Sequence, residues 1–108
     1  VGSTLANLGS IYNYRDPGKG CKYYSRAIEV NSRQPLSLAS NYRGLSAAIF
    51  NIAQQEESKA SKKEHIVRAR EALYSAVTWA NKLGQSHEVQ MCTEMANAID
   101  DFEIREQL

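Results

Sequence analysis

The first thirty residues place small and large side chains at the spacings by which two helices pack closely. Leu8 and Gly9 stand side by side and are followed by Tyr12, while a second segment carries Tyr24 and Ala27 three residues apart. A glycine or alanine at a contact lets two helix backbones approach, and the larger side chains fill the remaining space. The sequence therefore predicts a helical hairpin held together by a close contact between its two helices.

This arrangement resembles the tetratricopeptide repeat (TPR), in which each repeat is a pair of antiparallel helices. Such repeats bury their apolar faces only by stacking on their neighbours. Strand signals are nearly absent, since the chain has no sustained alternation of apolar and polar residues and no Asn-Gly or Asp-Gly turn. We therefore expect an all-α fold, a TPR-type helical-hairpin solenoid of about five antiparallel helices.

Turn and capping residues set the predicted helix boundaries. Asp16 is predicted to cap the second helix, and Ser61, followed by Glu64 at the capping-box spacing, is predicted to begin the fourth. Gly84 suits a left-handed helix end, and Ser86 is predicted to cap the fifth helix. The expected helices cover residues 3–14, 17–31, 35–57, 61–83 and 86–106.

These helices make one domain of two repeats and a final helix. We assign residues 1–34 to a first repeat and 35–84 to a second repeat, whose inter-helix link is lengthened by the polar segment 56–63. Residues 85–108 form a terminal or capping helix, whose wide apolar arc either seals the end of the stack or docks a partner protein. The chain does not begin with Met, and we interpret it as a fragment of a longer repeat protein.

Neither the composition nor any motif of the sequence indicates an enzyme. The 13 basic and 12 acidic residues give a net charge of +1, which exerts no general attraction on nucleic acid or lipid. Cys21 and Cys92 lack the spacing of metal ligands, and no nucleotide-binding or nucleophile motif occurs. The longest apolar stretch, 45–53, is too short to span a bilayer. We expect no catalytic residues, cofactor, metal, nucleic acid or small-molecule substrate.

The repeat register predicts a partner-binding groove. In TPR proteins, fixed positions on the first helix of each repeat line a concave face. The groove positions that we select here are Ser10, Asn13, Arg43, Ala47 and Phe50. Chaperone-binding TPR domains hold a C-terminal carboxylate with Lys and Asn, and the matching positions here do not carry that pair. Arg43 alone is able to hold a carboxylate, so we expect Arg43→Glu to weaken partner binding while the chain still folds.

A local run of basic residues precedes the fourth predicted helix. It contains Lys59, Lys62 and Lys63. One interpretation is a solvated loop and helix start, and the other is a surface for an acidic partner or lipid headgroups. Lysines near a helix N-terminus oppose the helix dipole, which lends the second interpretation modest support.

The order of these parts resembles one particular family of TPR proteins. Segment 22–31 is followed by the alanine-rich segment 44–49, the lengthened link 58–63 and a long helix that contains Trp79. Together they resemble the C-terminal part of subunit 2 of the endoplasmic-reticulum membrane protein complex, over roughly residues 7–102.

The resemblance implies a non-catalytic scaffold on the cytosolic side of the endoplasmic reticulum. Such a subunit holds cytosolic segments of its partner subunits in a complex that inserts proteins into the membrane. It would be cytoplasmic and peripheral to the membrane through those partners, without a span of its own. The alternative is a generic TPR adaptor or co-chaperone that binds peptide segments in its groove.

Overall fold

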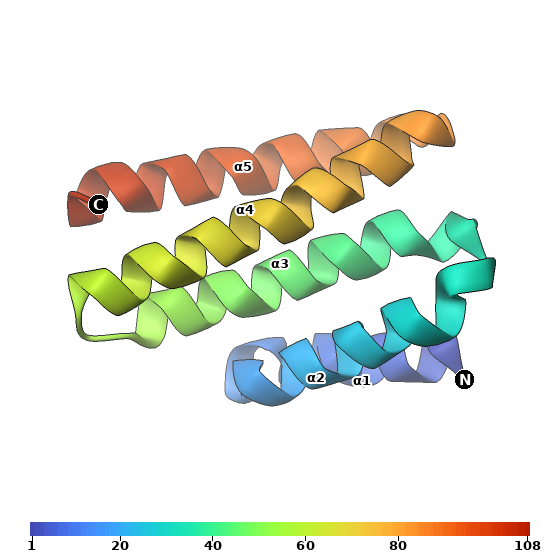
Figure 1. The fold of residues 1–108 in the computed structure, drawn as a ribbon, viewed down its shortest axis with the longest axis horizontal. Coiled ribbons are helices and arrows are strands. Elements are labelled where there is room, and N and C mark those ends of the chain that lie inside the picture. The colour runs from blue at the N-terminus through green and yellow to red at the C-terminus, as the bar shows by residue number, and fades with distance from the viewer.

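Five α-helices joined by short connections make up the computed structural model, which describes all residues from 1 to 108 (Figure 1). Two short 3-10 turns, η1 (Asn31–Arg33) and η2 (Pro35–Ser37), join the second helix to the third. The helices are α1 (Gly2–Arg15), α2 (Pro17–Val30), α3 (Leu38–Gln55), α4 (Lys59–Lys82) and α5 (Ser86–Glu106). The structure contains no strand, and the predicted all-α class is confirmed.

The helices form two hairpins, α1–α2 and α3–α4, with α5 lying along the second hairpin (Figure 1). Each helix packs against the next one in the chain. α1 also contacts α3, and α3 contacts α5, so the odd-numbered helices form a continuous row. The resulting stack measures 38 × 26 × 17 Å.

The connection between α1 and α2 is a single residue, Asp16, and this residue caps α2 as predicted. Its side chain accepts a hydrogen bond from the backbone N–H of Lys19 at 3.3 Å, and Pro17 occupies the first helical position. The carboxylate satisfies a free N–H group at the helix start, and the proline needs no such partner. Together these residues start α2 immediately after α1 ends.

The predicted start of the fourth helix at Ser61 is wrong. α4 begins at Lys59, and Ser58 is the cap, accepting a hydrogen bond from the N–H of Ser61 at 3.1 Å. Lys and Ala are good helix formers, so this polar stretch continues the helix without an apolar face. The link is only 56–58, and the extra length of the second hairpin lies in helices of 18 and 24 residues rather than 14.

Two further boundaries differ from the sequence prediction. Ser86 is the first helical residue of α5 rather than its cap, and the cap position holds Gln85, whose side chain instead donates to the carbonyl of Leu36 at 3.0 Å. The expected third helix begins as a 3-10 turn at 35–37 before α3 proper. Gly84 does adopt the predicted left-handed conformation, with φ of 67°.

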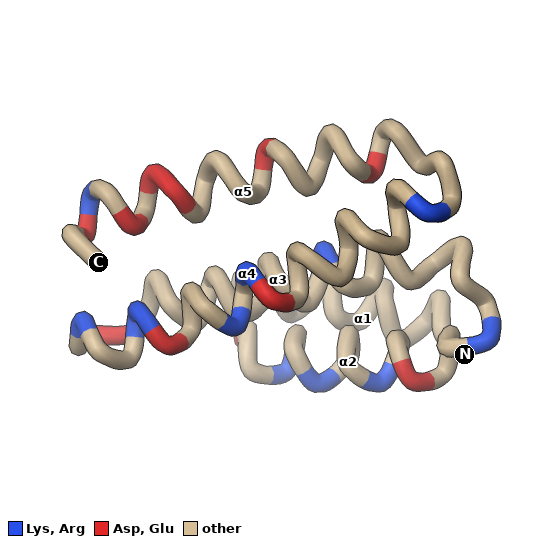
Figure 2. Tube along the Cα trace, turned by 45° about the horizontal axis from the view of Figure 1, so that its top comes forward, with Lys and Arg blue, Asp and Glu red and all other residues tan.

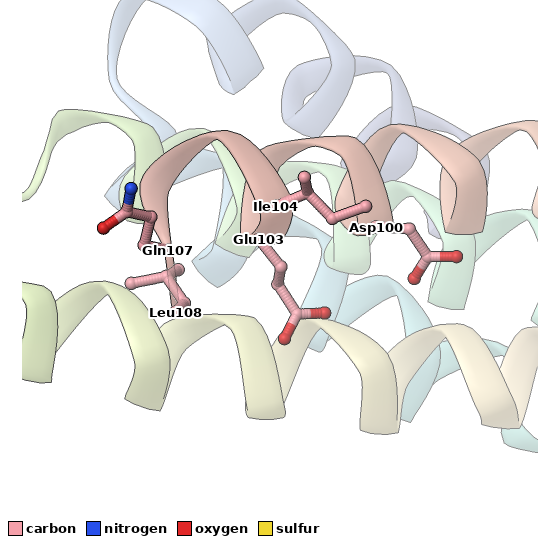
Figure 3. Close-up of a pocket in the computed structure, with 5 residues that line it drawn as sticks. All are labelled: Asp100, Glu103, Ile104, Gln107 and Leu108. Carbon is pink, nitrogen blue, oxygen red and sulfur yellow. The ribbon is translucent and has the colours of Figure 1, made fainter.

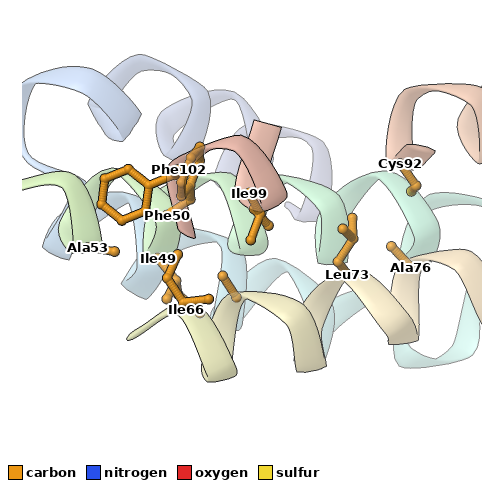
Figure 4. Packing of buried hydrophobic residues seen from close by; sticks show 10 residues of the cluster. Ile49, Phe50, Ala53, Ile66, Leu73, Ala76, Cys92, Ile99 and Phe102 are labelled. Carbon is orange, nitrogen blue, oxygen red and sulfur yellow. The ribbon is translucent and has the colours of Figure 1, made fainter. Parts of the chain in front are cut away.

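The largest hydrophobic core lies between α3, α4 and α5 (Figure 4). Ile49 and Phe50 of α3 meet Ile66 of α4 and Ile99 and Phe102 of α5, and all five side chains are buried. The Phe50 and Phe102 rings meet edge to face with centroids 5.4 Å apart, an arrangement that aromatic pairs favour. The apolar arc of α5 is wide because the helix packs on two neighbours at once.

A second packing centre joins α1, α2 and α3 at the ring of Tyr24. A Cβ atom placed on Gly9 of α1 would lie 2.7 Å from the ring, and one placed on Gly44 of α3 would lie 2.3 Å from it. Both distances are far below the separation of carbon atoms in contact. The ring is therefore held between two helix backbones, and the close approach predicted at Gly9 is confirmed.

We expect Gly44→Ala to lower the free energy of unfolding. The added methyl group would overlap the Tyr24 ring, which cannot move away because the backbone of Gly9 lies opposite. Overpacking costs about 1–3 kcal/mol, and the better helix propensity of alanine returns at most about 1 kcal/mol. Chemical denaturation measures the difference. The matched control is Gly18→Ala, whose Cβ would meet only an Asp16 oxygen at 3.5 Å. Equal stability of the two variants would contradict the packing described here.

Candidate interaction surface

The two predicted groove residues on α1 lie in different environments. Ser10 is exposed, whereas Asn13 is buried where α1 meets α2 and α3. The carbonyl of Asn13 accepts a hydrogen bond from Asn51 at 2.8 Å, and a Cβ on Gly20 would lie 2.5 Å from the Asn13 side chain. Asn13 therefore joins three helices, and only Ser10 is open to a partner.

Arg43 already binds a carboxylate, that of Glu88 at the start of α5. Arg43 Nε donates to Glu88 Oε2 at 2.9 Å and Arg43 Nη2 donates to Oε1 at 3.2 Å. Their side chains are 24% and 18% exposed, so the pair is shielded from much of the solvent. The hydrogen bonds that Arg43 donates to Glu88 raise the pKa of Arg43. The carboxylate-binding capacity predicted for Arg43 is used within the chain.

Tyr24 lies between the groove residues of α1 and α3. Burial raises the pKa of its hydroxyl, opposed by a contact with Ser10 and by the positive charge of Arg43. The geometry agrees, since the ring lies against Gly9 and Gly44, the sequence neighbours of Ser10 and Arg43.

The remaining groove positions lie further along α3. Ala47 is half-buried, and Phe50 is buried against Phe102 of α5. α5 thus lies over α3 from Arg43 to Phe50, and the five predicted residues do not form one open groove. Of the five residues, only Ser10 is exposed, and Ala47 is half-buried.

Oppositely charged side chains hold α5 to α4. Lys62 binds Glu106, and Arg70 binds both Asp100, at 2.6 Å, and Glu103. In Figure 2 the acidic residues of α5 and the basic residues of α4 are visible along the two helices. Hydrogen bonding to Lys62 and its charge lower the pKa of Glu106. The carboxylates of Asp100, Glu103 and Glu106 are therefore engaged by the neighbouring helix.

The ion pair of Lys62 reduces the basic surface predicted at Lys59, Lys62 and Lys63. Lys62 pairs with Glu106, whereas Lys59 and Lys63 are exposed and make no ion pair. Two lysines, rather than three, remain free for an acidic partner at the start of α4.

The largest hollow, of about 540 Å³, lies at the C-terminal end of α5 (Figure 3). Its lining residues are Asp100, Glu103, Ile104, Gln107 and Leu108. Both carboxylates bind Arg70, and Glu103 extends from α5 toward α4. The acidic groups of this hollow therefore stabilise the docking of α5.

A second basic surface lies on α2 and was not selected from the sequence. Lys19, Lys22 and Arg26 are all exposed. Their spacing of three and four residues places them on one face of the helix. That spacing is present in the sequence, although the net charge of +1 gives no sign of a local basic surface.

Comparison with protein-family models, with curated proteins and with solved structures finds no match to this chain. No group of three or more His, Cys, Asp or Glu side chains is arranged to hold a metal ion. None of the five helices combines the length and the hydropathy that crossing a membrane requires.

We expect Arg43→Glu to loosen α5, because it would place two carboxylates together at a half-buried contact. Hydrogen bonds to charged groups contribute about 1.5–3 kcal/mol, so a loss of this order is expected in chemical denaturation. The double exchange Arg43→Glu with Glu88→Arg restores the opposite charges and should recover part of the loss. If the double exchange is as unstable as the sum of the single substitutions, the Arg43–Glu88 contact does not hold α5.

We expect acid to release α5 before it affects the α1–α2 hairpin. The pKa of Glu106 is lowered from 4.5 in the folded chain, so its ionisation adds stability above that value. The contribution is lost as the pH falls below 4.5 through the lower folded-state pKa. Hydrogen exchange of α5 amides, corrected for intrinsic rates, should show this loss. Glu106→Gln should remove that part of the pH dependence, and an unchanged profile would contradict the assignment.

Proposed function

We propose that this chain is a TPR-type solenoid segment that acts as a non-catalytic scaffold. In this proposal it belongs to an endoplasmic-reticulum membrane protein insertase complex and lies on the cytosolic face of the membrane. It would hold cytosolic segments of partner subunits and reach the membrane through them. The proposal combines the family resemblance of segments 22–31, 44–49 and 58–63 with the arrangement of the helices.

The observation that carries the proposal is the stacking of the two hairpins through small residues. Gly9 and Gly44 admit the Tyr24 ring between their helices, and Ala27 and Ala76 are fully buried. TPR repeats place small residues at such contacts so that consecutive hairpins stack. A stack of this kind presents long helix faces to other proteins, which suits a scaffold.

The engagement of Arg43 favours a scaffold over the adaptor alternative. An adaptor that captures peptide carboxylates needs a free cation in its groove, whereas Arg43 is paired with Glu88 through two hydrogen bonds. A peptide carboxylate would have to displace an intramolecular partner whose effective concentration is high. Partner segments would instead meet the exposed Ser10 or the exposed lysines Lys59 and Lys63.

The test is to tag the full-length protein in its own cells and solubilise the membranes in a mild detergent. We expect membrane-embedded subunits of the endoplasmic reticulum to co-purify at a fixed ratio to the tagged protein. Gly44→Leu, which disrupts the stack, should lose the whole set, whereas Gly18→Ala should retain it. The comparison separates loss of the scaffold from loss of a single contact.

Other results would contradict the scaffold. Soluble chaperones recovered at variable ratios would indicate the adaptor. A membrane complex that persists with Gly44→Leu would show that the helix stack is not the part that binds it.

A further inference from the structure

The outward face of α2 carries a straight row of positive charge. Lys19, Lys22 and Arg26 are exposed, and the exposed Glu29 follows them in the sequence. Figure 2 shows blue segments in succession along α2, followed by a red one. At a rise of 1.5 Å per residue the row extends over about 10 Å. We call these three residues the α2 basic row.

The α2 basic row has no acidic partner within the chain. Elsewhere the structure pairs its cations where helices meet, as at Arg43, Lys62 and Arg70. No ion pair involves Lys19, Lys22 or Arg26, and the adjacent carboxylate of Asp16 caps the helix instead. Three aligned cations without counter-charges repel one another slightly, so this face is complementary to an external anion.

The α2 basic row begins at a position where a positive charge is unfavourable for helix stability. Lys19 is the third residue of α2, where an acidic side chain would complement the helix dipole. The first turn of α2 contains no acidic residue. Exposed residues that lower local stability commonly have a function.

Tyrosine rings lie beside the row. Tyr23 stacks on Tyr12 of α1 with ring centroids 5.7 Å apart, and the amine of Lys19 lies 5.0 Å from the Tyr12 ring centroid. Lys19, Lys22, Tyr23 and Arg26 line a hollow of about 200 Å³. The contact with the Tyr12 ring restricts the mobility of the Lys19 amine beside the hollow, which favours binding in a defined orientation.

We propose that the α2 basic row docks an acidic helix of a partner protein, with carboxylates three or four residues apart. The chain itself provides the precedent, since α5 docks on α4 with Asp100, Glu103 and Glu106 at intervals of three. The row is short and ends at the exposed acidic residue Glu29, so it matches about two turns of a helix better than a membrane surface or a nucleic acid. This inference rests on the proposed scaffold function, because it names one class of partner segment.

The test uses the 108-residue chain and a synthetic helix-forming peptide of alanine and glutamine, with glutamate at every third or fourth position. Fluorescence anisotropy measures its affinity for the unmodified chain and for Lys22→Glu with Arg26→Glu. The matched control is Arg33→Glu with Lys82→Glu, which changes the net charge equally at exposed residues elsewhere. We expect about a tenfold loss of affinity for the α2 variant and little loss for the control.

The salt dependence gives a second measure. Binding through the row should weaken as salt rises, and the slope should be smaller for the α2 variant. If the charge reversal alters thermal melting, Lys19→Gln with Lys22→Gln and Arg26→Gln replaces it. That variant removes the charges without introducing new ones and should also lose affinity.

Several results would overturn the inference. One is an equal loss of affinity in the control, which would indicate general charge attraction. Another is the absence of peptide binding. Binding to vesicles of phosphatidylcholine and phosphatidylserine in preference to the peptide would identify a membrane surface instead. Self-association in sedimentation velocity that the α2 variant abolishes would identify a second copy of the chain as the occupant. None of these results bears on the co-purification described above, so failure of this inference is distinguishable from failure of the scaffold proposal.

Discussion

The structure depends on one aromatic ring held between two helix backbones. Tyr24 of α2 is only 8% exposed because Gly9 of α1 and Gly44 of α3 lie on either side of its ring. A side chain on either glycine would push a helix outward, and the contact of α1 with α3 would then weaken. The ring therefore couples the first hairpin to the second, since neither α1 nor α3 is able to move without opening a gap beside it. It also lies beside Arg43, so the same contact connects the packing of the hairpins to the cation that holds α5.

α5 is attached by different means, a core contact flanked by ion pairs. Ile99 and Phe102 are buried in the main core, while Arg43, Lys62 and Arg70 bind carboxylates at both ends of the helix. Exposed ion pairs contribute little to stability, but they fix the register of two helices by disfavouring misaligned pairings. The apolar arc of α5 supplies most of the free energy of docking, and the charges determine where along α3 and α4 it lies.

The sequence predicted the features that depend on local chemistry. The cap at Asp16, the left-handed Gly84 and the close contact at Gly9 all follow from the side chain or backbone requirements of single residues, and all are present. α4 begins at Lys59, before the predicted start at Ser61, because the residues of this polar stretch favour helix although they provide no apolar face. The engagement of Arg43 by Glu88, 45 residues later, has no local signal, since it depends on how α5 lies across α3. For the same reason, sequence spacing alone was insufficient to distinguish an open groove from one covered by the chain's own helix.

The net charge of the chain does not show how unevenly the charges are distributed among its helices. The chain carries +1 overall, yet α5 has six acidic residues against one basic residue, and α4 has six basic against two acidic. Folding brings the two helices together, so carboxylates of α5 neutralise Lys62 and Arg70. These two cations therefore no longer contribute to the charge that a partner meets. The charge that stays exposed belongs to cations without an oppositely charged neighbouring helix, and Lys19, Lys22 and Arg26 of α2 are exposed and make no ion pair. A charge balance near zero excludes a uniformly basic protein, but it leaves room for a local basic surface once the acidic residues are used internally.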